Sequence, residues 1–162
     1  VAEMRHNSWM RDEALGTFID YHVGFCNIDQ PTYTRAMPPT AFLTSSIGYV
    51  RLHGRNCFNW YQDNTDPARV HRYDYLYSEA ELAEWKTRID RFRPHAAKTF
   101  VILNNDAGGK AVVNAVQLQR LLNPQGPPAP EELLRRFRVQ LAGRHDAAQA
   151  SLFTEYAGRA VA

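Results

Sequence analysis

Apolar residues recur along this chain with two different periods, one typical of β-strands and one typical of α-helices. Short apolar runs predict strands at residues 1–6, 23–29, 47–53 and 99–103. Apolar positions three and four residues apart predict helices over about 11–22, 78–92, 110–122 and 131–141, with a helical tail near 147–156. Alternating strands and helices are typical of an α/β fold in which helices cover a parallel sheet.

The helix that begins near residue 78 has the clearest start signal. Ser78 and Glu81 have the spacing of a capping box, in which each side chain bonds the backbone amide of the other residue. Leu82, Trp85 and Ile89 follow at spacings of three and four residues, which places them on one face of the helix. We therefore expect this face to be buried.

The strand at residues 47–53 ends in charged residues that are costly to bury. In the stretch YVRLHGR, Arg51 and His53 alternate with apolar residues and so share one side of the strand. The same alternation puts Glu3 and Arg5 on one side of the first strand. Acidic partners could neutralise the arginines, so the two strands predict a shared polar cleft.

The second strand adds to this polar face. Asn27 and Asp29 alternate with Cys26, which we expect to face the helices as a core residue. At the carboxyl ends of the strands, where active sites of (β/α) barrels lie, we expect one polar face. Its members are Glu3, Arg5, Asn27, Asp29, Arg51 and His53, with Asn104 or Asn105 from the fourth strand.

Proton transfer and anion binding are the chemistry that this polar face favours. His53 beside Asp29 or Glu3 is a candidate general acid or base, since histidine titrates near neutral pH. Guanidinium groups match phosphate and carboxylate, so we expect Arg5, Arg51 and Arg55 to bind an anion. A buried network of salt bridges that holds the strands in place is the alternative for the same residues.

A second anion-binding signal follows the strand at residues 99–103. The stretch NNDAGGK leads into a helix N-terminus, where free backbone amides attract anions. We expect Asn104, Asn105, Gly108, Gly109 and Lys110 to contribute to the ligand site. The stretch lacks the residues of a Walker loop, and a tight structural turn is the alternative.

Composition narrows the class of protein. Nineteen basic and seventeen acidic residues give a formal net charge of +2, too small to require a nucleic-acid or membrane partner. No apolar run approaches the roughly 20 residues of a membrane span. Cys26 and Cys57 have no spacing typical of a disulfide framework or a zinc site. We therefore expect a cytoplasmic protein with reduced cysteines.

Four stretches, in this order, resemble the domain of unknown function 72 (YecE-like) family: AEMRHNSW, YVRLHGR, YDYLYSEAELAEW and LNNDAGGKAVVNA. The resemblance implies that residues 1–122 are the C-terminal half of a TIM-like (β/α) barrel of about 250 residues. It also implies that the first half of that barrel precedes Val1, so that the chain supplies about four of its strands. A Pro-rich linker at residues 123–130 and a helical C-terminal extension at 131–162 follow. The family name leaves the reaction unknown.

The function expected first is that of an enzyme or binder for a small anionic ligand, phosphorylated or sugar-like, at the carboxyl ends of the strands. Whether the protein is an enzyme, and with which cofactor, stays open. A nucleic-acid-binding or metal-dependent endonuclease-like barrel is one alternative, and a non-catalytic binding barrel is another. The aromatic stretch from Trp60 to Tyr77 is either a lid that stacks on a ligand or side chains that pack the loop onto the barrel.

A metal site and a homodimer are two further expectations to test. Glu3, His6, Asp29 and His53 carry donor atoms that suit divalent metals. Against this, His6 alternates away from Glu3, and the nearby arginines would repel a cation, so we assign no metal ligands. An open half-barrel has unpaired strand edges, which makes a homodimer through those edges an expectation.

Overall fold

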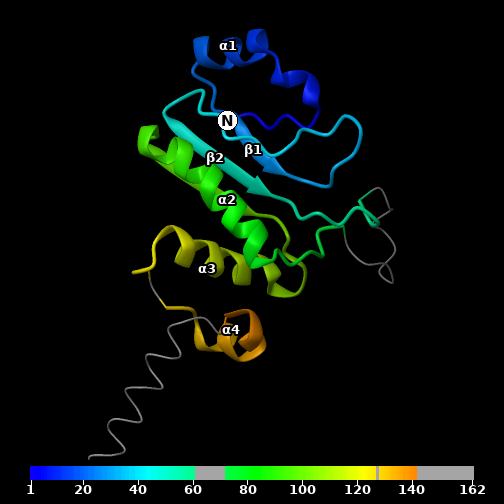
Figure 1. Cartoon of the computed structure of the whole chain (residues 1–162), viewed down its shortest axis with the longest axis vertical. Coiled ribbons are helices and arrows are strands. Elements are labelled where there is room, and N and C mark those ends of the chain that lie inside the picture. The colour runs from blue at the N-terminus through cyan, green and yellow to red at the C-terminus, as the bar shows by residue number, and fades with distance from the viewer. Residues whose placement is uncertain (61–71, 127, 142–162) are drawn as a thin grey trace, which may run out of the picture. The chain divides into compact units, whose positions relative to one another are not determined.

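The structure, a computed structural model, describes residues 1–60, 72–126 and 128–141 of the chain. It divides into two compact units, Val1–Pro124 and Gln125–Ala162. The first unit is an α/β fold around a parallel three-stranded sheet in the order β1-β2-β3. The strands are β1 (Cys26–Asp29), β2 (Ile47–Leu52) and β3 (Lys98–Leu103). Figure 1 shows α2 lying alongside β2, with α3 next to α2.

The helices of the first unit follow the predicted pattern closely. They are α1 (Asp12–Asp20), α2 (Glu79–Phe92) and α3 (Lys110–Leu122), with short 3-10 turns η1 (Asn7–Met10), η2 (Arg93–His95) and η3 (Ala107–Gly109). The capping box at the start of α2 is confirmed, because Ser78 accepts from the Glu81 amide and Glu81 accepts from the Ser78 amide. Local side-chain to backbone bonding therefore fixes where α2 begins.

One face of the sheet is covered by helices. Val50 and Leu52 on β2 are fully buried against a cluster that α2 and α3 complete. The buried helical residues of this cluster are Leu82, Trp85, Ile89, Phe92 and Leu118. Burying large apolar side chains contributes roughly 1.5–3 kcal/mol each, so this face holds much of the stability of the unit.

The register of the strands decides which residues share a face. Cys26 pairs with Tyr49 and Ile28 pairs with Arg51, so Cys26 lies on the same face as Arg51. Asp29 pairs with Leu52 and therefore lies on the helix-covered face. The expectation that Asn27 and Asp29 share the polar face with Arg51 is wrong. Cys26 is a buried core residue, as expected, but it lies on the Arg51 side of the sheet, in a cluster with Phe18 of α1. Each strand alternates as predicted, but β1 is shifted by one residue relative to the expected alignment.

The opposite face of the sheet, which we call the open face, carries the other residues of β2 and β3. Arg51 pairs with Ile102 and Tyr49 pairs with Phe100 across this face. Phe100 and Ile102 are both exposed in part. The open face is thus apolar along the strands and becomes polar at their carboxyl ends.

The first predicted strand forms only a parallel bridge to the sheet. Ala2 bridges Phe25, with its amide donating to Gly24 and its carbonyl accepting from Cys26. Beyond Ala2 the chain is held differently, since the Arg5 carbonyl accepts from Met37. The sheet therefore has three strands instead of the four expected, with the segment at residues 2–5 beside β1.

The second unit begins after Pro124 and contains short helices. α4 (Glu131–Arg136) and α5 (Arg138–Leu141) replace the single helix predicted over 131–141. Phe137 interrupts them with a non-helical backbone conformation, φ −122° and ψ 42°. The helical tail predicted near 147–156 lies outside the described residues. Among the helices that the structure describes, none is both long and apolar enough to cross a membrane.

Candidate functional site

Glu3 is the centre of a polar cluster on the open face, at the carboxyl end of β2. Its Oε1 accepts from Arg5 Nε at 2.8 Å, and its Oε2 accepts from Arg51 Nη1 at 3.0 Å. The Nε2 atom of His53 lies 3.1 Å from Oε1. Three predicted site residues thus contact a single carboxylate, as the alternation along their strands predicts.

The surroundings of Glu3 keep its carboxylate ionised. Burial alone would raise the pKa, but the hydrogen bond and charge of His53, the charge of Arg5 and the bond from Arg51 together lower it to about 2, from an ordinary value of 4.5. At neutral pH Glu3 is therefore an acceptor only. Any group that forms a hydrogen bond with the Glu3 side chain must therefore be the donor.

His53 is fully buried and has two different ring nitrogens. Nε2 lies 3.1 Å from both Glu3 Oε1 and Arg5 Nη2. Because Arg5 can only donate and Glu3 can only accept, Nε2 satisfies one of them at a time. Within the described residues, Nδ1 is buried and has no hydrogen-bond partner. A buried imidazole nitrogen without a partner is unusual and needs an explanation.

Aromatic rings surround the His53 imidazole. The ring centroids of Trp60 and Tyr73 lie 6.3 and 6.0 Å from that of His53. The two rings also meet edge to face at 5.9 Å, and Arg5 lies 5.9 Å from the Trp60 centroid. Trp60 and Tyr73 thus pack at the site, within the aromatic stretch that the sequence singled out. Residues 61–71 of that stretch lie outside the described part of the chain.

Arg5 and Arg51 keep part of their guanidinium groups accessible to solvent. Their side chains are 41% and 37% exposed, although each contacts Glu3. Arg51 also donates from Nε to the Asn104 side chain at 3.2 Å, so Asn104 joins the site as predicted. Two arginines around one carboxylate leave the cluster with excess positive charge. Such a surface suits an anion.

Asp29 and Arg55 form a separate cluster on the helix-covered face. Arg55 Nε donates to both Asp29 oxygens at 3.0 Å, and Trp85 Nε1 donates to Asp29 Oδ2 at 2.7 Å. Arg55 also donates to Glu81 at 3.0 Å. Burial by itself would lower the pKa of Arg55, but its bonding to Asp29 and the charges of Asp29 and Glu81 raise it. The side chains of Asp29 and Arg55 therefore lie apart from that of His53, with which the sequence had grouped them, although the His53 amide donates to the Asp29 carbonyl at 2.9 Å.

The loop before α3 carries the remaining predicted ligand residues. Gly108 and Gly109 have positive φ angles of 65° and 85°, a backbone conformation that glycine adopts at no cost. Lys110 pairs with Asp74, and Asn105 is buried, donating to the Tyr75 carbonyl and the Asn114 side chain. These contacts fit the predicted tight turn. They place Asn105 toward α3, whereas Asn104 points to Arg51.

Sequence reasoning missed the bond that shapes the turn after His53. Gly54 has φ +90°, and its amide donates to the Tyr77 hydroxyl at 2.7 Å. Asn114 in turn accepts from the Tyr77 amide and donates to its carbonyl. The glycine was a local signal for a turn, but nothing in the sequence linked it to a tyrosine 23 residues away.

Cysteine chemistry and metal binding receive no support from the geometry. Burial, followed by the nearby charge of Glu3, raises the pKa of Cys26 to about 12, which keeps its thiol protonated. In the described ranges no three His, Cys, Asp or Glu side chains lie close enough together to hold a metal ion. The polar cluster is instead built from one acidic, one imidazole and two guanidinium groups.

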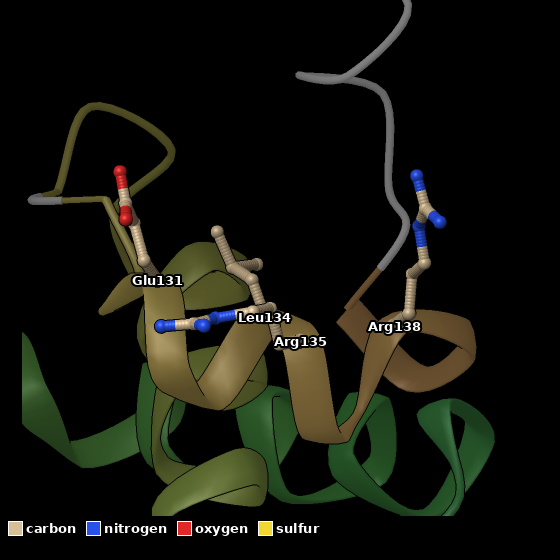
Figure 2. Close-up of a pocket in the computed structure, with 4 residues that line it drawn as sticks. All are labelled: Glu131, Leu134, Arg135 and Arg138. Atoms are coloured by element: carbon tan, nitrogen blue, oxygen red, sulfur yellow. The ribbon is translucent and has the colours of Figure 1, made fainter.

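The second unit has a hollow of its own. A pocket of about 460 Å³ is lined, among the described residues, by Glu131, Leu134, Arg135 and Arg138. Figure 2 shows the Arg135 side chain lying beside Leu134, with Arg138 projecting from the following helix. Arg135 pairs with the exposed Glu132 at 2.8 Å. The predicted site residues all belong to the first unit.

Most of the chain matches the model of a known protein family. Residues 1–135 match the model of the family described as "Protein of unknown function DUF72". The chain belongs to the DUF72 family. This match confirms the resemblance seen in the sequence. The description of the family names no activity.

Relatives of this DUF72 chain are longer than the chain itself. It is 33% identical to the UPF0759 protein YunF of Bacillus subtilis over 98 residues, which cover 59% of this chain and 35% of that protein. A DUF72 family protein of Thermotoga maritima matches at 32% identity with a TM-score of 0.65, over 73% of this chain and 44% of that one. A DUF72 family protein of Enterococcus faecalis matches at 28% identity with a TM-score of 0.65, over 79% and 50%. The chain thus spans about half the length of these solved relatives, or less.

Proposed function

We propose that the cluster of Glu3, Arg5, Arg51 and His53, with Asn104, binds a small anionic ligand, phosphorylated or sugar-like. The observation that carries the proposal is the state of His53. Its ring is held at Nε2 by Glu3 while its buried Nδ1 has no partner among the described residues. A purely structural histidine would normally have both nitrogens satisfied. A ligand group at Nδ1 would supply the missing bond.

The arginines provide the charge for that ligand. Arg5 and Arg51 are tied to Glu3 by part of their donors and are exposed by more than a third. Guanidinium groups bind phosphate and carboxylate with two parallel hydrogen bonds. The bond from Arg51 to Asn104 steadies its side chain in one orientation. We therefore assign anion binding to Arg5 and Arg51.

If the protein is an enzyme, His53 is the residue that moves a proton. With Glu3 ionised and holding Nε2 of His53, proton exchange with a ligand would take place at Nδ1. Nδ1 can then accept a proton from a ligand, while the Glu3 carboxylate stabilises the imidazolium that forms. Glu3 orients the ring in the way that a carboxylate orients a catalytic histidine in a proton-transfer dyad.

The position of the cluster also favours the barrel interpretation. We propose that residues 1–122 form part of a TIM-like (β/α) barrel, with residues 123–130 as a linker and 131–162 as a helical extension. The support is the parallel order β1-β2-β3 and the site at the carboxyl ends of the strands. Sites in (β/α) barrels lie at that end. Gly108 and Gly109 in η3 and Lys110, the first residue of α3, follow the same end of β3, and we include them in the proposed ligand site.

Binding is tested by thermal unfolding of the chain with inorganic phosphate, sugar phosphates, simple carboxylates and short oligonucleotides, each with and without a chelator. A ligand at a hundredfold over its Kd stabilises the folded state by about 2.7 kcal/mol. We expect stabilisation by phosphate or sugar phosphate that persists with chelator. Arg51→Lys should weaken it about tenfold, because lysine cannot bind the anion with a planar pair of donors. Arg11→Lys, at an exposed arginine of the same unit, is the matched control and should change nothing.

The remaining outcomes separate the alternatives. Stabilisation only by oligonucleotide, lost at high salt, would favour a nucleic-acid-binding barrel. Stabilisation only by a divalent metal would favour the endonuclease-like alternative. His53→Asn distinguishes an enzyme from a binder, since it should weaken binding by the loss of one hydrogen bond but abolish turnover altogether. No shift with any member of the panel would contradict the proposed function.

A further inference from the structure

Two buried polar side chains follow neighbouring strands of the sheet, each directly after the last residue of its strand. Gln30 follows β1 and is 3% exposed, and His53 follows β2 and is fully buried. Each has one buried atom without a hydrogen-bond partner among the described residues, Oε1 of Gln30 and Nδ1 of His53. The function proposed above accounts for Nδ1 and leaves Oε1 unexplained.

The register of the strands places Gln30 beside His53. Asp29 pairs with Leu52, and the His53 amide donates to the Asp29 carbonyl, so Gln30 and His53 come next along the two strands. Arg5 contacts both of them. Its carbonyl accepts from Gln30 Nε2 at 3.0 Å, and its Nη2 lies 3.1 Å from His53 Nε2. Gln30 therefore adjoins the cluster to which we assign anion binding.

The orientation of the Gln30 amide is fixed by its neighbours. Nε2 donates to the carbonyl oxygens of Arg5 and Met37, at 3.0 and 3.4 Å. Turning the amide over would place Oε1 against these two oxygens, which can only accept. Oε1 is therefore an acceptor held in one position, and the group that bonds to it must be a donor.

The chemistry of that donor is restricted. An ionised carboxylate or phosphate oxygen has no hydrogen to donate, whereas a hydroxyl does. A hydroxyl is also about as small as a water molecule, the kind of group that reaches buried polar atoms. Oε1 lies inside the fold of this chain, so a strand or helix packed on the surface would not reach it. A ligand that satisfies Arg5, Arg51 and Gln30 together has an anionic group and a hydroxyl.

We propose that Gln30 determines specificity by accepting a hydrogen bond from a hydroxyl of the ligand. The ligand is then a hydroxylated phosphate ester, such as a sugar phosphate, and not a simple anion. This inference rests on the proposed function, because Arg5 and Arg51 must hold the anionic group near Gln30. An ordered water on Oε1 is the alternative, and it would give no preference among anions.

The test is calorimetric titration of the chain with propyl phosphate, glycerol phosphate and ribose 5-phosphate. Propyl and glycerol phosphate share a carbon chain and an anionic group and differ in their hydroxyls. We expect the better hydroxylated probe to bind about three- to tenfold more tightly than propyl phosphate, the contribution of one neutral hydrogen bond. Gln30→Met should bring this ratio to about one. Gln119→Met, at an exposed glutamine of α3, is the matched control and should keep it.

The ratio of two affinities separates recognition from a structural effect, because a disturbed site would lose affinity for both probes alike. Binding of all probes without preference, or a preference that Gln30→Met retains, would overturn this inference and leave the proposed function standing. If none of these phosphates binds, the inference fails as well. The ligand panel of the proposed function, which includes carboxylates, then decides that proposal separately.

Gln30→Met also removes the bonds to Arg5 and Met37, so thermal unfolding must show that the variant is folded. If it is not, NMR of the Gln30 side-chain amide in the unaltered chain decides. A bond at Oε1 polarises the whole amide, so its signal should move with the hydroxylated probe and much less with propyl phosphate. An unmoved signal, or an equal response to both probes, would contradict the proposal.

Discussion

The two faces of the sheet each carry an arginine–carboxylate cluster, and the clusters differ in how completely they are satisfied. On the helix-covered face, Asp29 is almost fully buried and receives bonds from Arg55 and Trp85. On the open face, Glu3 joins Arg51 and a histidine that still has an unpartnered nitrogen among the described residues. Similar groups therefore differ in how much bonding capacity they have left.

The difference follows from what surrounds each cluster. A buried ion pair requires excellent geometry and further hydrogen bonds to offset desolvation, and the Asp29 cluster has both. Once satisfied in this way, it has little capacity for a ligand. The Glu3 cluster keeps its arginines in contact with solvent, where they remain available for binding. This difference in bonding is the reason that we propose a ligand site at Glu3 and none at Asp29.

Breaking the buried cluster should produce the largest effect. Asp29→Asn removes the charge that pairs with Arg55, and we expect the free energy of unfolding to fall by about 3–5 kcal/mol. Urea denaturation measures this loss. Glu84→Gln changes an exposed member of the same cluster, 3.6 Å from Arg55, and should cost less than about 1 kcal/mol. Equal losses for the two variants would refute the role of burial.

Trp85→Phe tests the contribution of one neutral donor to that cluster. It removes the indole N–H that reaches Asp29 and keeps most of the apolar contact in the core. We expect the free energy of unfolding to fall by about 2 kcal/mol, because the buried Asp29 carboxylate loses one donor and the core loses some packing. Trp9→Phe, at an exposed tryptophan, should cost no more than about 0.5 kcal/mol in the same urea experiment. A loss at Trp85 no greater than at Trp9 would show that this bond is unimportant.

Glu3→Gln should have the smallest effect at neutral pH, about 1 kcal/mol, because the cluster is partly exposed. This cost should shrink in acid, because the unaltered chain then loses the same stabilisation. The pKa of Glu3 is about 2 in the folded protein against an ordinary 4.5, so the unfolded chain takes up the proton first as the pH falls. The stabilisation from Glu3 is complete above about pH 4.5 and is lost between there and pH 2.

Unfolding measured from pH 6 to pH 2 should therefore show a shallower decline for Glu3→Gln than for the unaltered chain. Glu13→Gln, at an exposed glutamate of α1, is the matched control and should keep the original slope. Identical slopes for all three proteins would mean that Glu3 is not held ionised by its neighbours. A neutral-pH loss as large as that of Asp29→Asn would make the open-face cluster structural.

Much of the local structure could be predicted from short stretches of sequence. The bounds of α3 match the predicted helix at 110–122, and the capping box fixes the start of α2. Arg51 and His53 were grouped correctly because alternation along β2 is a local property, whereas Glu3 and Arg5 reach the same cluster from a segment that joins the sheet only at Ala2. The interruption at Phe137 could not be predicted, since the apolar pattern continues across it.

Local patterns predicted three of the strands, the helices of the first unit and the alternation of side chains within each strand, but they also predicted a strand at residues 1–6 and one continuous helix at 131–141, which the structure lacks. Only the tertiary structure decided how β1 aligns with β2, and that alignment put Asp29 with Leu52 and Cys26 with Tyr49. The physical reason is that side chains alternate with a period of two, so a shift of one residue between strands exchanges the faces. The local preferences of residues cannot reveal that shift, because it is set by the pairing of strands that are distant in the sequence.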